Sequence, residues 1–388
     1  MTNEIEIDSS KFQLYNYEYS EPAIINLKIS YNEFFEKYLS KNQACLIKNI
    51  AGDWNSSKLW IKEDSPNFSY LQQTYGDSVV SVTNCDRQST YNQQPVKWKF
   101  RDYLDYWENR ISNSNESTLY VKDWHLKNEN PKDDFYDIPL YFASDWLNEY
   151  LIENSIDDYR FVYMGVNGTW SPFHVDVMTS YSWSTNVFGQ KLWVLFPPGE
   201  EEHFYDSLGN LPNDTTDVKN KGKHFEIVQN PGDAMFVPSN WHHQVWNVTD
   251  TISINHNWIN GCNLHNVWKA MEKNLMEVKI EINDCSDMEN FLDHSQLMLK
   301  ASFGFNFKEY FEFMLYIAMK RIHSLKKEED IKLFEKYSLG RNHTEYDLRS
   351  IRYTLLDLIN HCDTKELGCF QNLQCPPEYL LQLIDDIL

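Results

Sequence analysis

The sequence is poor in basic residues and contains no long apolar run. Its 35 Lys and Arg compare with 57 Asp and Glu, which gives a formal net charge of −22. Proteins that bind nucleic acid through its phosphates need clustered cations, so this balance argues against direct nucleic-acid binding and favours a basic protein partner. The longest apolar run, residues 313–319, is far shorter than the ~20 residues that cross a bilayer, and residues 1–11 do not resemble a secretory signal. We therefore expect no membrane association.

Cysteine is also scarce, with an odd number of seven residues scattered along 388. A disulfide scaffold needs paired cysteines in a small chain, so the sequence predicts free thiols in a reducing compartment, and hence a cytoplasmic protein. Aromatic residues, by contrast, are abundant at 15%, and hydrophobic residues reach 42%. This composition excludes a disordered chain and indicates a folded protein with a large core.

The sequence divides into three regions. Residues 1–20 read as a flexible lead-in, residues 21–262 as a domain with a β-rich core and residues 263–388 as a C-terminal helical domain. Between about 118 and 258, short aromatic and β-branched runs are separated by Gly and Pro, which is typical of an antiparallel sandwich or barrel. Apolar residues recur at helical spacing in six segments, which are 30–39, 100–111, 266–279, 288–300, 307–325 and 348–360. We therefore predict an α+β fold.

The segment with the clearest chemistry is WSPFHVD, residues 170–176. Residues two apart on a strand project from the same face, so His174 and Asp176 point together. An imidazole beside a carboxylate supplies two thirds of a facial triad for non-haem iron, whose third ligand is a second imidazole. The HxD pattern alone also arises by chance.

A second segment, PGDAMFVPSNWHH at residues 231–243, offers that imidazole. Its Pro-Gly-Asp turn and buried strand lead into a strand that begins with two histidines. His242 and His243 lie on opposite faces of that strand, so only one of them can be the ligand.

The HxD pair, followed about 70 residues later by G-D-x-x-F-V-P-x-x-W-x-H, resembles the JmjC-domain Fe(II)/2-oxoglutarate oxygenases. The resemblance implies a double-stranded β-helix (cupin, or jelly-roll) core, with N-terminal α/β decoration and a C-terminal helical module. It implies Fe(II) as cofactor and 2-oxoglutarate and O2 as co-substrates. The ligands would be His174, Asp176 and His243, because the family ligand stands five positions after the proline, here Pro238. His242 would then be a packing residue.

The resemblance also implies a co-substrate site. In the family a lysine on a strand after the HxD pair binds the far carboxylate, and Lys191 in GQKLWVLFPP has that place. A lysine buried in an aromatic strand needs an anion, although its ammonium could instead reach solvent at the strand end. Four further polar residues complete the site by resemblance, namely Tyr120, Ser171, Ser184 and Asn255. Strand 251–258 places Thr251, Ser253, Asn255 and Asn257 on one face, a polar row that suits a liganded cavity.

Within this family the sequence is most similar to lysyl hydroxylases of eukaryotic translation release factor one. That likeness implies hydroxylation at C4 of a lysine, which promotes translation termination in the cytoplasm. Two alternatives stay open: a JmjC lysine demethylase acting on methyl-lysine proteins, and a catalytically inactive cupin-fold interaction protein. The C-terminal helices could form a homodimer, and the long polar connection at 199–224 could contact substrate.

Overall fold

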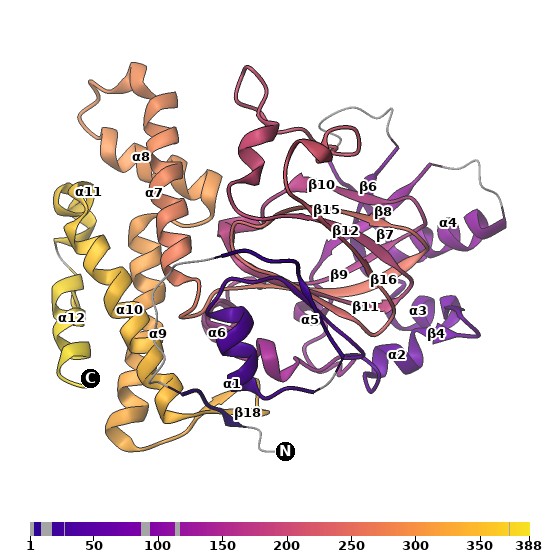
Figure 1. Ribbon diagram of the computed structural model, residues 1–388, viewed down its shortest axis with the longest axis horizontal. Helices are drawn as coiled ribbons and strands as arrows, with labels where there is room; N and C mark the ends of the chain where they lie inside the picture. Colours follow the sequence, from indigo (N-terminus) through magenta and orange to yellow (C-terminus); the bar gives the residue numbers. More distant parts are fainter. Residues whose placement is uncertain (1–3, 9–17, 27, 87–93, 113–116, 372) are drawn as a thin grey trace.

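Two β-sheets form the centre of the molecule, and helices from the C-terminal third lie at one end of them (Figure 1). The structure is a computed structural model that describes residues 4–8, 18–26, 28–86, 94–112, 117–371 and 373–388. The strands are β1 (Glu4–Ile5), β2 (Ala23–Ile25), β3 (Cys45–Ile47), β4 (Ile61–Lys62), β5 (Ser65–Pro66), β6 (Val79–Asn84), β7 (Val96–Lys99), β8 (Leu119–Trp124), β9 (Arg160–Gly165), β10 (Trp170–His174), β11 (Tyr181–Phe188), β12 (Lys191–Phe196), β13 (Phe225–Gln229), β14 (Ala234–Val237), β15 (His242–Asn247), β16 (Thr251–Trp258), β17 (Ile331–Leu333) and β18 (Tyr337–Leu339). The α-helices are α1 (Tyr31–Phe34), α2 (Asn55–Leu59), α3 (Phe68–Tyr75), α4 (Phe100–Ser112), α5 (Leu126–Glu129), α6 (Trp146–Glu153), α7 (Leu264–Glu281), α8 (Phe291–Phe303), α9 (Phe307–Lys327), α10 (Arg341–Asn360), α11 (Cys362–Glu366) and α12 (Pro377–Asp385).

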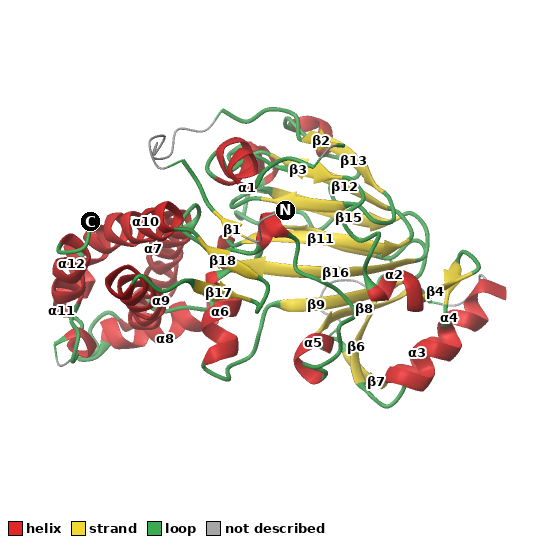
Figure 2. Ribbon diagram, turned by 90° about the horizontal axis from the view of Figure 1, so that it is seen from below, coloured by secondary structure: helices red, strands yellow, loops and turns green. Residues whose placement is uncertain are grey.

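The two central sheets have interleaved strand orders. The smaller runs β10-β15-β12-β13, and the larger runs β2-β3-β14-β11-β16-β9-β8-β6-β7. Figure 2 shows the larger sheet from β2 to β7, with α3 and α4 beside its β7 end. From β9 to β16 the chain passes back and forth between the two sheets, with β12 and β13 as a hairpin within the smaller one. This is the arrangement of a jelly roll, and the predicted α+β fold with a cupin-type core is confirmed.

Local sequence explains the core strands. All four residues of β14 are buried, and the strand is a continuous apolar run. All eight residues of β16 are buried as well, and this strand carries its polar row turned inward. The predicted helix at 30–39 is confirmed as α1 and a following π-helical turn, and the Ser30 hydroxyl caps it by accepting a hydrogen bond from the Glu33 amide at 3.1 Å. The sequence pattern did not predict β13 or α6.

The N-terminus departs from expectation. The prediction of a flexible lead-in is wrong for residues 4–8, because β1 pairs in parallel with β18 and places Ile5 opposite Leu339. Ile5 is fully buried and Glu6 accepts a hydrogen bond from the His343 amide at 2.9 Å. Two isolated isoleucines are too weak a pattern to predict a strand whose partner lies more than 300 residues away. The remainder of the lead-in at 1–3 and 9–17 lies outside the described residues, and the domain boundaries stay predictions.

The C-terminal module consists of packed helices, as predicted. Helices α7, α8, α9 and α10 cover the four expected segments, while α12 and the β17–β18 hairpin were not predicted. Its apolar core is continuous with Trp146 and Leu147 of α6 and with Ile259 at the end of β16, so the module packs on the β core. None of the helices in the described ranges combines the length and apolar composition needed to cross a membrane. All seven cysteines lie in those ranges and are free thiols, as expected.

One buried arginine joins the module to the core. Arg321 on α9 is completely buried and donates to both carboxylate oxygens of Glu149 on α6, at 2.9 and 3.1 Å. It also donates to Asp347 on α10 at 3.1 Å. Three helices therefore share one ion-pair cluster shielded from water.

Arg321→Ala is expected to destabilise the protein by about 3–5 kcal/mol, because the buried Asp347 loses its arginine and the buried Glu149 keeps only the partly exposed Lys320. Urea unfolding followed by circular dichroism measures this change. The exposed Lys327→Ala on the same helix is the control and is expected to change stability by less than about 0.5 kcal/mol. Equal stability of the two variants would contradict the structural role of Arg321.

The long connection at 199–224 packs behind the smaller sheet. Phe204 packs against Phe173 and Phe196 with ring centroids 5.6 and 5.1 Å apart, and the Asn213 carbonyl accepts a hydrogen bond from the Phe173 amide at 2.8 Å. These contacts support β10 immediately before His174. A contact of this connection with substrate stays a prediction.

Candidate metal and co-substrate site

A cavity of about 460 Å³ lies between the two sheets, with walls from β10, β12 and β15 on one side and β8, β9, β11 and β16 on the other. All eight site residues predicted from the sequence line it, namely Tyr120, Ser171, His174, Asp176, Ser184, Lys191, His243 and Asn255. The fold therefore brings together side chains from six segments that are distant in sequence.

Strand pairing assembles the predicted metal ligands. In the antiparallel β10–β15 pair His174 lies directly opposite His243, and their ring centroids are 4.3 Å apart. Asp176 follows the end of β10. One ligand atom from each of the three side chains lies within 4.8 Å of the other two. His242 faces away and packs on Phe173, with ring centroids 5.3 Å apart, so the structure brings His243 and not His242 into the cluster.

Hydrogen bonds orient the two imidazoles for metal binding. His174 Nδ1 lies 2.6 Å from the Pro172 carbonyl oxygen and His243 Nδ1 lies 3.0 Å from that of Trp241. A carbonyl only accepts, so each Nδ1 carries the proton and each Nε2 lone pair is left for a metal. Burial, followed by the charge of His243, lowers the pKa of His174 to about 4. The His174 ring is therefore neutral at physiological pH, and protons do not compete with a metal.

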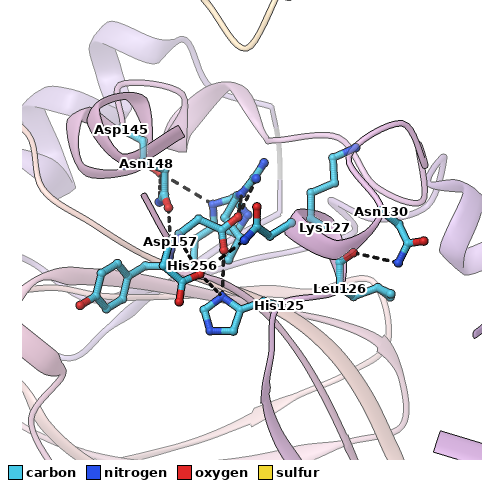
Figure 3. Close-up of polar contacts among 12 residues, drawn as sticks. His125, Leu126, Lys127, Asn130, Asp145, Asn148, Asp157 and His256 are labelled. Carbon is cyan, nitrogen blue, oxygen red and sulfur yellow. Dashed lines mark hydrogen bonds and ion pairs between the residues drawn. The ribbon is translucent and has the colours of Figure 1, made fainter. Parts of the chain in front are cut away.

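Two other clusters in the described part of the chain also bring together potential ligands. His125 lies 3.1 Å from Asp157 and 3.0 Å from Asp158, and Figure 3 shows the polar network around His125 and Asp157. Arg160 pairs with Asp158 at 2.6 Å and already compensates its charge. A cation would therefore have to compete with an arginine at this cluster.

The remaining cluster contains His361, Cys362 and Asp363, and Lys279 pairs with Asp363 at 2.5 Å. The Asp176 carboxylate differs from both, because it accepts a hydrogen bond from the neutral Ser182 hydroxyl at 2.6 Å and has no Lys or Arg within 4 Å among the residues that the structure describes. His174, Asp176 and His243 thus form the cluster whose charge and donor set fit a divalent metal such as iron.

Lys191 is a buried cation without a carboxylate partner. Its side chain is 2% exposed, and its ammonium donates to the Ser253 hydroxyl at 2.7 Å. No carboxylate of the described chain lies within 4 Å, and burial together with the charge of Lys122 lowers the pKa of Lys191 to about 7. The Ser184 hydroxyl in the same cavity is buried and has no hydrogen-bond partner in the described structure. A free cation and a free hydroxyl fit an anion, so the solvent-exposed alternative for Lys191 is wrong.

Of the other predicted contacts, Asn255 lies near Lys191, because both donate to the Ser253 hydroxyl, Asn255 at 3.2 Å. Tyr120 on β8 is 2% exposed and lines the same cavity, as does Ser171. Their contacts with the co-substrate stay predictions. Among the other residues that line the cavity, the sequence reasoning gave no role to several polar and aromatic ones, including Lys122, Asp123, Tyr163, Ser182 and Trp193. Lys122 stands two positions after the predicted site residue Tyr120, and this spacing is the sequence signal that could have identified Lys122 as a cavity residue.

The buried position of Lys191 predicts proton uptake on binding a dianion. With a pKa of about 7 the side chain is largely neutral at pH 8, and an adjacent carboxylate restores the ammonium by raising its pKa. We expect uptake of about one proton per molecule of N-oxalylglycine at pH 8, and less at pH 6. Calorimetric titration in buffers of different ionisation enthalpy measures this. Proton uptake that persists in Lys191→Met would contradict the assignment of Lys191 as the group that takes up the proton.

Comparison with known proteins agrees with this geometry. A family model described as Cupin-like domain matches residues 31–263, so the protein belongs to the class of cupin-like proteins. The chain is 40% identical over 380 residues to the Mus musculus protein named 2-oxoglutarate and iron-dependent oxygenase JMJD4, covering 92% of this chain and 88% of that protein. It is 41% identical over 358 residues to the Drosophila melanogaster homologue of that name, covering 83% and 84%. The Arabidopsis thaliana protein named arginine-specific demethylase JMJ20 is 38% identical over 313 residues, covering 74% and 68%.

The chain belongs to the JMJD4 family of 2-oxoglutarate and iron-dependent oxygenases, within the cupin-like class. The resemblance to JmjC-type oxygenases is thereby confirmed. The cofactor is Fe(II), and 2-oxoglutarate and O2 are the co-substrates. Family membership and the intact set of His174, Asp176 and His243 argue against the catalytically inactive interaction protein.

Proposed function

We propose that the protein hydroxylates C4 of a lysine in eukaryotic translation release factor one and so promotes translation termination in the cytoplasm. The observation that carries the proposal is the joint presence of the triad cluster and Lys191 in one cavity of a chain closely related to JMJD4. The sequence segments around these residues resemble a lysyl hydroxylase of that factor.

The side chains of the cavity have separable tasks in this reaction. His174, Asp176 and His243 would hold the iron. Lys191 binds the far carboxylate of 2-oxoglutarate and fixes its orientation. When bound, iron would supply the O2 chemistry of the reaction, in which 2-oxoglutarate is converted to succinate and CO2, one oxygen atom entering succinate and the other entering the substrate C–H bond as hydroxyl.

A cationic substrate fits the entrance of the cavity. Asp123 lines the cavity with an exposed side chain, and the Tyr163 hydroxyl donates to its Oδ1 at 2.6 Å. A carboxylate held in this way attracts an ammonium group. The net charge of −22 favours the approach of a basic protein segment.

Mass spectrometry of the intact release factor tests the proposal. After incubation with the enzyme, Fe(II), ascorbate and 2-oxoglutarate, we expect a gain of one oxygen on a single lysine, with the hydroxyl at C4 by fragmentation and NMR of the digested peptide. The product should be absent without 2-oxoglutarate and with Asp176→Ala. Succinate formation without any oxidised lysine would overturn the assignment of substrate but not that of the oxygenase.

A demethylase is the second candidate, because JMJ20 is named an arginine-specific demethylase. The same site would oxidise an N-methyl carbon, and the resulting hydroxymethyl amine would release formaldehyde. Methyl-arginine and methyl-lysine peptides in the same incubation test this reading. Formaldehyde release with loss of the methyl group, in place of lysine oxidation, would favour it.

We also propose that the C-terminal helices mediate a homodimer. Four large apolar side chains on α7 and α8 are exposed, namely Met276, Ile280, Leu297 and Met298. A monomeric mass for the wild-type protein by light scattering would refute the dimer. If the double variant Ile280→Glu, Leu297→Glu is still a dimer, the interface lies on another surface.

A further inference from the structure

The cavity wall contains a second lysine, Lys122 on β8. It lines the same cavity as the triad cluster and Lys191, and its ammonium lies 5.3 Å from the centroid of the Tyr120 ring. Its side chain is partly buried. Neither the pattern in the sequence nor the names of the relatives gives this residue a role.

A β-bulge places Lys122 in the cavity wall. In the β8–β9 pair Val121 lies opposite Met164 and Trp124 lies opposite Val162, so Lys122 and Asp123 together oppose the single residue Tyr163. Asp123 has a φ of 52°, in the left-handed region that aspartate tolerates at some cost. Such bulges redirect side chains and are common beside active sites. The fold thus maintains a strained turn that sets the direction of Lys122.

Lys122 has no carboxylate within 4 Å in the described ranges of the chain. The adjacent Asp123 is held instead by the Tyr163 hydroxyl. Burial lowers the pKa of Lys122, and its positive charge in turn lowers the pKa of Lys191 in the same cavity. Two lysines without anionic partners therefore act on each other across the cavity. A bound dianion would relieve this repulsion, whereas a single far carboxylate at Lys191 would relieve only part of it.

We propose that Lys122 is a second binding residue for the 2-oxoglutarate dianion and neutralises the carboxylate at its metal-binding end, while Lys191 neutralises the far carboxylate. The two cations then match the two charges of the co-substrate. This assignment does not depend on the identity of the protein substrate, because it concerns only the co-substrate cavity.

Ligand binding to Mn(II)-loaded protein tests the proposal without turnover. N-oxalylglycine carries both carboxylates, whereas oxalate carries only the chelating end. Calorimetric titration with Lys122→Met is expected to show about tenfold weaker binding of both ligands, since a charged hydrogen bond is lost. Lys191→Met is expected to weaken N-oxalylglycine and leave oxalate within about twofold.

The matched variants distinguish the loss of the positive charge from a disturbance of the structure. Lys122→Arg keeps the cation and is expected to recover most of the affinity, and Lys122→Gln gives a second neutral variant if Lys122→Met folds poorly. Lys97→Met removes an exposed lysine on β7 and should leave both affinities unchanged. Unaltered oxalate and N-oxalylglycine affinity in a folded Lys122→Met or Lys122→Gln variant would overturn the proposal. Equal loss of affinity in Lys122→Arg would also overturn it, because the positive charge would then not be what binds.

Discussion

Asp176→Ala and His243→Ala are each expected to abolish iron-dependent turnover of 2-oxoglutarate. Each substitution removes one of three side chains whose ligand atoms lie within 4.8 Å of one another, and a metal held by two ligands is neither retained nor oriented. Loss of an outer partner of a ligand typically costs about 10–100-fold, so loss of a ligand should cost more than about 100-fold. Succinate formation and iron content after gel filtration measure both effects.

His242→Phe is the matched control for these variants. His242 neighbours His243 in sequence but packs on Phe173 at the opposite face of β15, so a similar aromatic ring should keep turnover within about twofold. Near-normal turnover in Asp176→Ala, or a large loss in a stable His242→Phe protein, would contradict the assignment of ligands.

Lys191→Met is expected to have opposite effects on binding and stability. The far carboxylate of 2-oxoglutarate loses its cation, so the KM for 2-oxoglutarate should rise by about 100-fold, equivalent to about 2.8 kcal/mol. The unfolding temperature of the co-substrate-free protein should rise, because a desolvated cation with no carboxylate partner among the described residues is replaced by an apolar side chain.

Lys97→Met again supplies the control, since its side chain is exposed on β7 and should change neither quantity. Steady-state kinetics with varied 2-oxoglutarate and thermal unfolding of the two variants give the required numbers. An unchanged KM in Lys191→Met would show that the far carboxylate is bound elsewhere in the cavity.

The sequence predicted the chemistry of the site better than its surroundings. The proximity of His174 and Asp176 was predicted from the alternation of a strand, although β10 ends at His174 and Asp176 follows it, and the choice of His243 came from the spacing of a family motif. The buried position of Lys191 followed from the apolar strand around it. These features depend on local pattern, which a single sequence contains.

Features that depend on distant partners were not predictable. The bulge that carries β8 past Lys122 and Asp123 to Trp124 depends on the pairing with Tyr163 of β9. The pairing of β1 with β18 joins opposite ends of the chain. Nothing in the local pattern of either segment indicates such a partner.

The most direct test of the account is a crystal structure with Mn(II) and N-oxalylglycine, read by anomalous scattering from manganese. We predict one strong peak bound by His174, Asp176 and His243, with the far carboxylate of the ligand on Lys191. A peak at the cluster of His125, Asp157 and Asp158, or a ligand carboxylate away from Lys191, would contradict it.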